Sequence, residues 1–171
     1  NGASAALRVF ACEPEWGALA KELAGDSANI YTATTAQQDT HHIQARPSLI
    51  AQVRRADLVV CTGAGLEDGW LPLVLRRAGN PSVQVGAAGY FSAADYVTLL
   101  EKPQRLDRAE GDVHAEGNPH IQLDPRNIQR VADALAERLA ELDSEHAADY
   151  RQRLQGFSER WQAAIQRWQQ Q

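Results

Sequence analysis

Short apolar runs alternate with amphipathic helical patterns along the first half of the chain, and this alternation most constrains the fold. The apolar runs occupy residues 7–12, 29–34, 57–61 and 82–85. Helical spacing of apolar residues follows the first three runs, over residues 13–25, from residue 47 through residue 53, and around residues 70–75 up to residue 79. Strands joined by such helices form right-handed crossovers. We therefore predict an α/β fold with a four-stranded parallel sheet flanked by helices.

The second half of the chain is expected to be mostly helical. Residues 92–100 are predicted to form a short helix, and residues 101–119, which are rich in Asp, Glu, Gly and Arg, a long loop. Asp124 followed by Pro125 marks a helix start, because the carboxylate can accept from free N–H groups and proline suits the first helical position. The buried stripe of this helix is expected to comprise Ile128, Val131, Leu135, Leu139 and Leu142.

Residues 144–171 predict a long final helix, because their apolar residues recur every three or four positions. Roughly 26 helical residues extend about 39 Å, which exceeds the width of a small lobe. We therefore expect the far half, with Trp161, Ile165 and Trp168, to require another partner. A coiled coil is a weaker alternative, because the pattern is short.

Composition excludes several classes of protein. Of the 171 residues, 44% are apolar and 23% are charged, which excludes a disordered chain and a membrane-embedded one. The net charge of −5 has the wrong sign for binding nucleic acid through its phosphates. The segment Ala3-Ser4-Ala5 resembles the end of a cleaved signal peptide, which favours export; an expression-vector remnant is the alternative.

Four of the five histidines fall in two predicted loops. His41 and His42 follow the second predicted strand, and His114 and His120 lie in and at the end of the 101–119 loop. Loops that leave the carboxyl ends of parallel strands meet at one edge of the sheet, where ligands bind. Imidazole suits zinc, whereas a carboxylate-rich set suits manganese. We therefore expect a zinc site here, with the Asp39 carboxylate as a further candidate ligand.

The two cysteines each end an apolar run. Cys12 and Cys61 can form a disulfide between adjacent strand ends in an oxidising compartment. Two buried free thiols are an equally acceptable interpretation of the sequence.

Three stretches occur in series: DTHHIQARPS at 39–48, ADLVVCTGAGLE at 56–67 and GNPHIQLDPRN at 117–127. Together they resemble the zinc and manganese substrate-binding proteins of bacterial ABC importers, the cluster A-I type. The resemblance covers nearly the whole chain. It implies a protein of two lobes, each a parallel sheet flanked by helices, that captures a metal ion between the lobes.

The resemblance also implies a division of the chain and a set of ligands. Residues 1–143 would form the amino-terminal metal-binding lobe, and residues 144–171 the helix that links it to a second lobe missing from this sequence. His41 corresponds to the first histidine ligand of the family and His120 to the second, while the other two ligands belong to the second lobe.

The chain departs from the family pattern at Thr40, where most members have proline. Because proline restricts the backbone, we expect the loop that carries His41 to be more mobile here. His42 is then an alternative ligand, and His114 is an auxiliary one.

The favoured function is a non-catalytic, periplasmic component that captures Zn²⁺ and delivers it to an ABC permease, with Mn²⁺ as the less favoured metal. A zinc hydrolase is the alternative from another class, with Glu67 or Asp39 as its general base. A third hypothesis is an interaction module that dimerises or swaps through the last helix.

Overall fold

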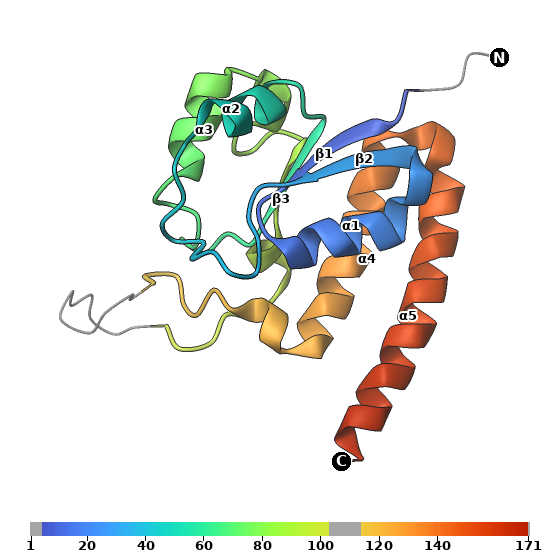
Figure 1. Ribbon diagram of the computed structural model, residues 1–171. Coiled ribbons are helices and arrows are strands. Elements are labelled where there is room, and N and C mark those ends of the chain that lie inside the picture. Colours follow the sequence, from blue (N-terminus) through green and yellow to red (C-terminus); the bar gives the residue numbers. More distant parts are fainter. Residues whose placement is uncertain (1–4, 103–113, 171) are drawn as a thin grey trace.

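The computed structural model describes residues 5–102 and 114–170 and contains one four-stranded parallel sheet among them (Figure 1). The strands are β1 (Leu7–Ala11), β2 (Ala28–Thr32), β3 (Leu58–Cys61) and β4 (Tyr90–Ser92), in the spatial order β2-β1-β3-β4. Helices cover both faces of the sheet, so the predicted fold class is confirmed.

The helices form two layers, one on each side of the sheet. Helices α1 (Pro14–Ala24), α4 (Pro125–Leu142) and α5 (Ala147–Gln169) lie on one side, and α2 (Pro47–Arg54) and α3 (Leu71–Ala78) on the other (Figure 1). Each layer encloses a core, with Trp16 in the first and Trp70 in the second, both at most 1% exposed. Short 3₁₀ segments are η1 (Gly25–Ser27), η2 (Pro81–Val83), η3 (Ala93–Tyr96), η5 (Ile121–Leu123) and η6 (Ser144–His146). None of the helices in the described ranges has the length and hydropathy needed to cross a bilayer.

The sequence predicts the fourth strand at residues 82–85, and this prediction is wrong because the strand is β4. The Asn80 side chain accepts a hydrogen bond from the Ser82 N–H and closes the 3₁₀ turn η2 instead. Val85 is 75% exposed, as a residue of a buried strand would not be.

Gly89 determines where the chain enters the sheet. A Cβ atom at this position would lie 2.3 Å from the Ser82 carbonyl oxygen and 2.5 Å from that of Asp57. Only glycine permits so close an approach of backbones. The strand therefore begins directly after this residue.

The helix predicted at residues 92–100 is also wrong in extent, because only η3 forms and Val97 is already extended. The predicted start of α4 is confirmed: the Asp124 side chain accepts from the Arg126 N–H. The expected stripe of α4 is buried at Val131, Leu135 and Leu139 and partly buried at Ile128 and Leu142. Residues 103–113 of the predicted loop lie outside the described residues.

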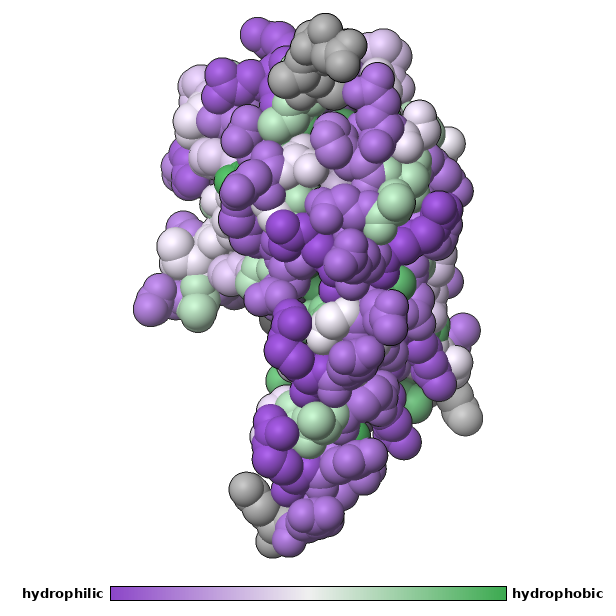
Figure 2. All heavy atoms as spheres, turned by 90° about the vertical axis from the view of Figure 1, so that its right-hand side faces the viewer, coloured by the Kyte–Doolittle hydropathy of each residue, from purple (hydrophilic) through white to green (hydrophobic). Residues whose placement is uncertain are grey.

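Helix α5 packs against α4 and α1 and presents a largely hydrophilic surface to the outside (Figure 2). Trp161 stacks on Phe157, with ring centroids 5.5 Å apart, and donates its indole N–H to the Pro125 carbonyl oxygen at 2.7 Å. Ile165 is 8% exposed, whereas Trp168 is 51% exposed. The expectation that the far half of this helix lacks cover is therefore right for Trp168 and wrong for Ile165 and Trp161.

A disulfide joins the carboxyl ends of β1 and β3. Ala11 pairs with Val60 in the parallel register, so the next residues, Cys12 and Cys61, lie opposite each other. Their Cα atoms are 4.8 Å apart, within the range that disulfides span. Of the two interpretations of the cysteines, the structure adopts the disulfide.

Two buried glutamates meet just beyond this disulfide. Glu67 accepts hydrogen bonds from the backbone N–H groups of Thr62 at 2.7 Å and Gly63 at 3.0 Å. Glu13 accepts one from the Thr62 hydroxyl at 3.1 Å, and a side-chain hydrogen bond joins the two carboxyl groups. Burial, together with the charge of Glu67, raises the pKa of Glu13 to about 10. Burial raises the pKa of Glu67 as well, so the pair retains a proton that two separate exposed carboxyl groups would lose.

The disulfide closes a segment of the chain between cysteines 49 residues apart. Replacing both, Cys12→Ala with Cys61→Ala, is expected to lower the free energy of unfolding by about 2–4 kcal/mol, because the unfolded chain regains the freedom that the link removes. Urea unfolding of the oxidised protein and the double variant measures the difference. Equal midpoints for the two proteins would contradict this prediction.

Replacing Glu13→Gln should remove a pH dependence of stability. Between about pH 4.5 and 10, Glu13 is ionised in the unfolded chain and protonated in the folded one, so the folded state binds more protons and stability falls as pH rises. The fall is at most about 1.4 kcal/mol per pH unit. Glutamine keeps one donor and one acceptor without titrating. The variant should match the parent below pH 4.5 and exceed its stability above that value.

Urea unfolding across this pH range provides the measurement, with Glu159→Gln, an exposed glutamate on α5, as the matched control. Curves of stability against pH that run parallel for the parent and Glu13→Gln would show that Glu13 ionises in the folded protein.

Candidate metal centre

The loop between β2 and α2 holds His41 through Asp39. Oδ1 of Asp39 accepts from the His41 backbone N–H at 3.0 Å and lies 2.8 Å from the ring Nδ1 of His41. Oδ2 lies 2.8 Å from Nδ1 of His42. These hydrogen bonds, that of His42 foremost, hold the pKa of Asp39 well below its usual range. The carboxylate thus fixes the His41 ring by one nitrogen and leaves Nε2 to face away from it.

Two residues that follow β3 secure the same loop. The Trp70 indole N–H donates to the Thr40 carbonyl oxygen at 2.9 Å. A Cβ atom at Gly69 would lie only 2.5 Å from the His41 carbonyl oxygen, so this glycine allows the two backbones to touch. The loop without the usual proline is therefore tied to the segment before α3 at Thr40 and His41.

The second loop presents His120 through Asn118. The Asn118 side-chain oxygen accepts from the His120 backbone N–H at 2.9 Å, while its amide group donates to Oε2 of Glu101 at 2.7 Å. The backbone N–H of Asn118 donates to the Leu100 carbonyl oxygen at 2.8 Å. This asparagine therefore joins the two ends of the 101–119 loop and places His120 just before η5.

Three of the predicted histidines come together at the carboxyl edge of the sheet. Nε2 of His41 lies 3.1 Å from Nε2 of His114, and the His41 ring centroid is 5.1 Å from that of His114 and 6.2 Å from that of His120. They line a hollow of about 220 Å³ with Glu101, Gly117, Asn118 and Pro119.

The other two predicted site residues lie beside this hollow. The His42 side chain is 73% exposed, against 19% for His41, and it is bound to Asp39. Asp39 lines a neighbouring pocket that also includes His41 and His120.

The spacing of the imidazole nitrogens suits a shared metal ion. Two nitrogens bound to one tetrahedral Zn²⁺ at about 2.0–2.1 Å lie about 3.3 Å from each other. The 3.1 Å between the Nε2 atoms of His41 and His114 is close to this value. The Asp39–His41 contact has the form of the carboxylate–histidine pairs that orient metal ligands. Across the described ranges, though, the histidines do not form a set of three mutually close ligand atoms.

The site gives no support to a hydrolase. The hydrolase hypothesis requires a carboxylate free to accept a proton from a metal-bound water. Asp39 is engaged by both His41 and His42, and Glu67 is 3% exposed and bound to backbone N–H groups. Neither candidate base is positioned for that role.

Sequence reasoning missed the residues that position the histidines. Gly69, Trp70 and Asn118 act through a close backbone approach and single hydrogen bonds, which leave no periodic signal in the chain. Asn118 is the exception. Asparagine side chains often accept a hydrogen bond from the backbone N–H two residues later, and Asn118 stands two residues before His120.

Comparison with known proteins agrees with the resemblance noted in the sequence. Residues 9–171 match the family model described as ZnuA, zinc-uptake complex component A periplasmic. The manganese ABC transporter substrate-binding lipoprotein scaA of Streptococcus gordonii is 24% identical over 163 residues, covering 94% of this chain and 49% of its own. The iron-binding protein YfeA of Yersinia pestis is 28% identical over 145 residues, which is 85% of this chain and 42% of its own.

A solved structure agrees as well. The crystal structure of ZnuA superimposes with a TM-score of 0.75 at 25% identity, over 94% of this chain and 56% of that one. The chain spans about half the length of the curated relatives it matches. Those relatives are, by their names, binding proteins rather than enzymes. With nearly all of its length matched, the chain belongs to the family of ZnuA, the periplasmic component A of zinc-uptake complexes.

Proposed function

We propose that this chain captures Zn²⁺ as cargo for an ABC metal importer and delivers it to the permease. His41 and His120 are the ligands, and His114 is an auxiliary ligand that faces His41. Asp39 orients the His41 ring, and His42 is held by Asp39 outside the hollow. In support, the family model describes a component of a zinc-uptake complex, and the Streptococcus gordonii relative is named as a substrate-binding lipoprotein of a manganese ABC transporter.

The observation that carries this proposal is the 3.1 Å between Nε2 of His41 and Nε2 of His114, with the His120 ring beside them. The two loops belong to chain segments more than 70 residues apart and meet at the edge of the sheet where ligands bind in such folds. An incidental pair of surface histidines would not be expected to share a hollow with a third imidazole or to be held by a carboxylate.

The choice of zinc rests on the ligands. Imidazole nitrogen suits zinc, and the described residues that line the hollow include three histidines and one carboxylate, that of Glu101. Relatives are named for manganese and for iron, so the family accommodates several divalent ions. We propose Zn²⁺ as the preferred cargo and Mn²⁺ as a weaker one.

The remaining coordination positions are proposed to be filled by a second lobe. Residues 1–143 constitute the metal-binding lobe, and residues 144–171, most of which form α5, constitute the linking helix. Relatives of about twice this length have room for such a lobe. Export to the periplasm or the cell surface follows the relatives, several of which are named lipoproteins. Dimerisation through α5 is not part of the proposal, because Phe157 and Ile165 are already buried.

Removing the imidazoles should remove metal binding. The double change His41→Ala with His120→Ala is expected to abolish binding of Zn²⁺ in isothermal titration, and His114→Ala to weaken it by about 10–100-fold, as the loss of a supporting group does. Binding by the parent should weaken in acid, because a metal ion must compete with protons for the imidazole nitrogens.

His146→Ala is the matched control, because His146 pairs with Asp143 next to α5, outside the candidate metal centre. Unchanged affinity in the His41→Ala, His120→Ala protein would refute the assignment of the ligands.

Gly69→Ala tests the positioning of the loop without touching a ligand. The new methyl group would displace the His41 carbonyl, so Zn²⁺ affinity should fall by about 10–100-fold while the fold persists. Gly156→Ala on α5 is the control, because a Cβ atom there meets only the end of Arg160 at 3.4 Å. Equal Zn²⁺ affinity for both variants would show that the Gly69 contact does not position His41.

A further inference from the structure

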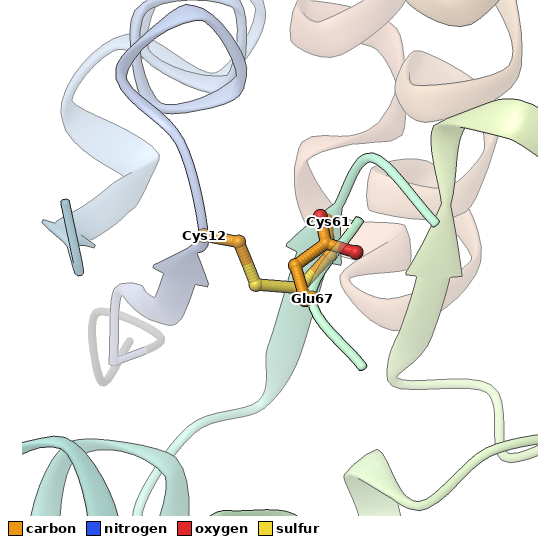
Figure 3. Close-up of side chains that lie close together, drawn as sticks. All are labelled: Cys12, Cys61 and Glu67. Carbon is orange, nitrogen blue, oxygen red and sulfur yellow. A yellow bond between two sulfur atoms is a disulfide. The ribbon is translucent and has the colours of Figure 1, made fainter. Parts of the chain in front are cut away.

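A second group of potential metal ligands lies inside the protein, next to the sheet. Cys12, Cys61 and Glu67 each place one ligand atom within 4.8 Å of the other two, and Figure 3 shows their side chains side by side. It is the one such group in the described part of the chain, and it shares no residue with the histidine site. The two cysteines are 0% exposed and Glu67 is 3% exposed.

A neighbouring buried oxygen adds a second observation. Oε1 of Glu13 is buried and has no hydrogen-bond partner in the described structure, while Oε2 accepts from the Thr62 hydroxyl. Glu13 directly follows Cys12, and its carboxyl group is hydrogen-bonded to that of Glu67. A buried polar atom without a partner is costly, and a water molecule bound to a nearby cation would provide a donor.

We propose that reduction of the Cys12–Cys61 disulfide creates a Zn²⁺ site in which both thiolates and the Glu67 carboxylate are ligands. A water molecule provides the fourth position. The site is closed while the disulfide is intact, since the sulfurs are then bonded to each other. The protein thus has a metal site governed by redox state, in addition to the histidine site of the proposed function.

The chemistry balances with a dithiol as reductant. One thiolate of the dithiol attacks one sulfur of the protein disulfide, and the second then resolves the mixed disulfide. Two electrons pass to the protein, the dithiol becomes a cyclic disulfide, and the two cysteines become thiols. Zn²⁺ then displaces the two thiol protons to solvent and forms two zinc–sulfur bonds.

The backbone already fits such a site. Two thiolates at about 2.3 Å from a tetrahedral zinc lie about 3.8 Å apart. The Cα atoms of Cys12 and Cys61 are 4.8 Å apart on paired strands, so side-chain rotation alone separates the sulfurs to that distance. The oxygens of Glu67 that accept from Thr62 and Gly63 keep further lone pairs for a metal, because a carboxylate offers about four acceptor positions.

Cobalt(II) is the probe, because thiolate ligands give it a sulfur-to-cobalt charge-transfer band that histidine ligands do not. The protein carrying His41→Ala and His120→Ala is unfolded, reduced with a dithiol and refolded under argon, so that access to the buried disulfide is not limiting. We expect one equivalent of Co²⁺ to bind with the charge-transfer band and to be displaced by Zn²⁺. The oxidised protein should show no such band.

Two variants sharpen the test. Cys12→Ala with Cys61→Ala should lose the band, and Glu67→Gln should keep it but bind Co²⁺ more weakly by about tenfold or more. Circular dichroism monitors the fold, and a thiol reagent counts the free cysteines. A folded chain with two free thiols and no band would overturn the proposal. An unfolded reduced chain that Co²⁺ does not restore would overturn it as well. Because His41 and His120 are replaced in this background, neither result bears on the proposed function.

Discussion

The parallel pairing of β1 with β3 is the interaction on which the rest of the structure depends. Val9 pairs with Leu58 and Ala11 with Val60, and the Cys12 N–H continues the ladder to the Val60 carbonyl oxygen. Because the strands end in register, the residues that follow them leave the sheet together. The disulfide, the buried glutamates and the loop that carries Gly69 all begin from that shared edge.

The architecture was predictable where apolar runs and helix signals are strong. Strand β3 is buried on both faces and is a continuous apolar run in the sequence, and β1 is apolar and buried except at Arg8. The sequence Asp124-Pro125 indicates the start of helix α4. Strand β4 was missed because it has only three residues and because its position depends on a backbone contact of Gly89, which composition does not reveal.

The ligands of the candidate site were predictable from the sequence, whereas the residues that position them were not. Histidines in loops are conspicuous, and the topology brings His41, His114 and His120 to one edge of the sheet. The role of Asp39 as an orienting group became visible only in the structure, through its two contacts with imidazole nitrogens. Glu13 and Glu67 were not expected to pair in the interior, because charged residues along a chain usually lie on the surface.

The hydrogen bond from the Trp161 indole to the Pro125 carbonyl gives α5 a mechanical connection to the histidine edge. Pro125 is the first residue of α4 and stands five positions after His120, with only the short turn η5 between them. A tilt of α5 about its first turn would draw the start of α4 with it and shift the imidazole at the rim. The last helix is therefore linked to His120 through one hydrogen bond to the start of α4 and the short turn η5 that precedes it.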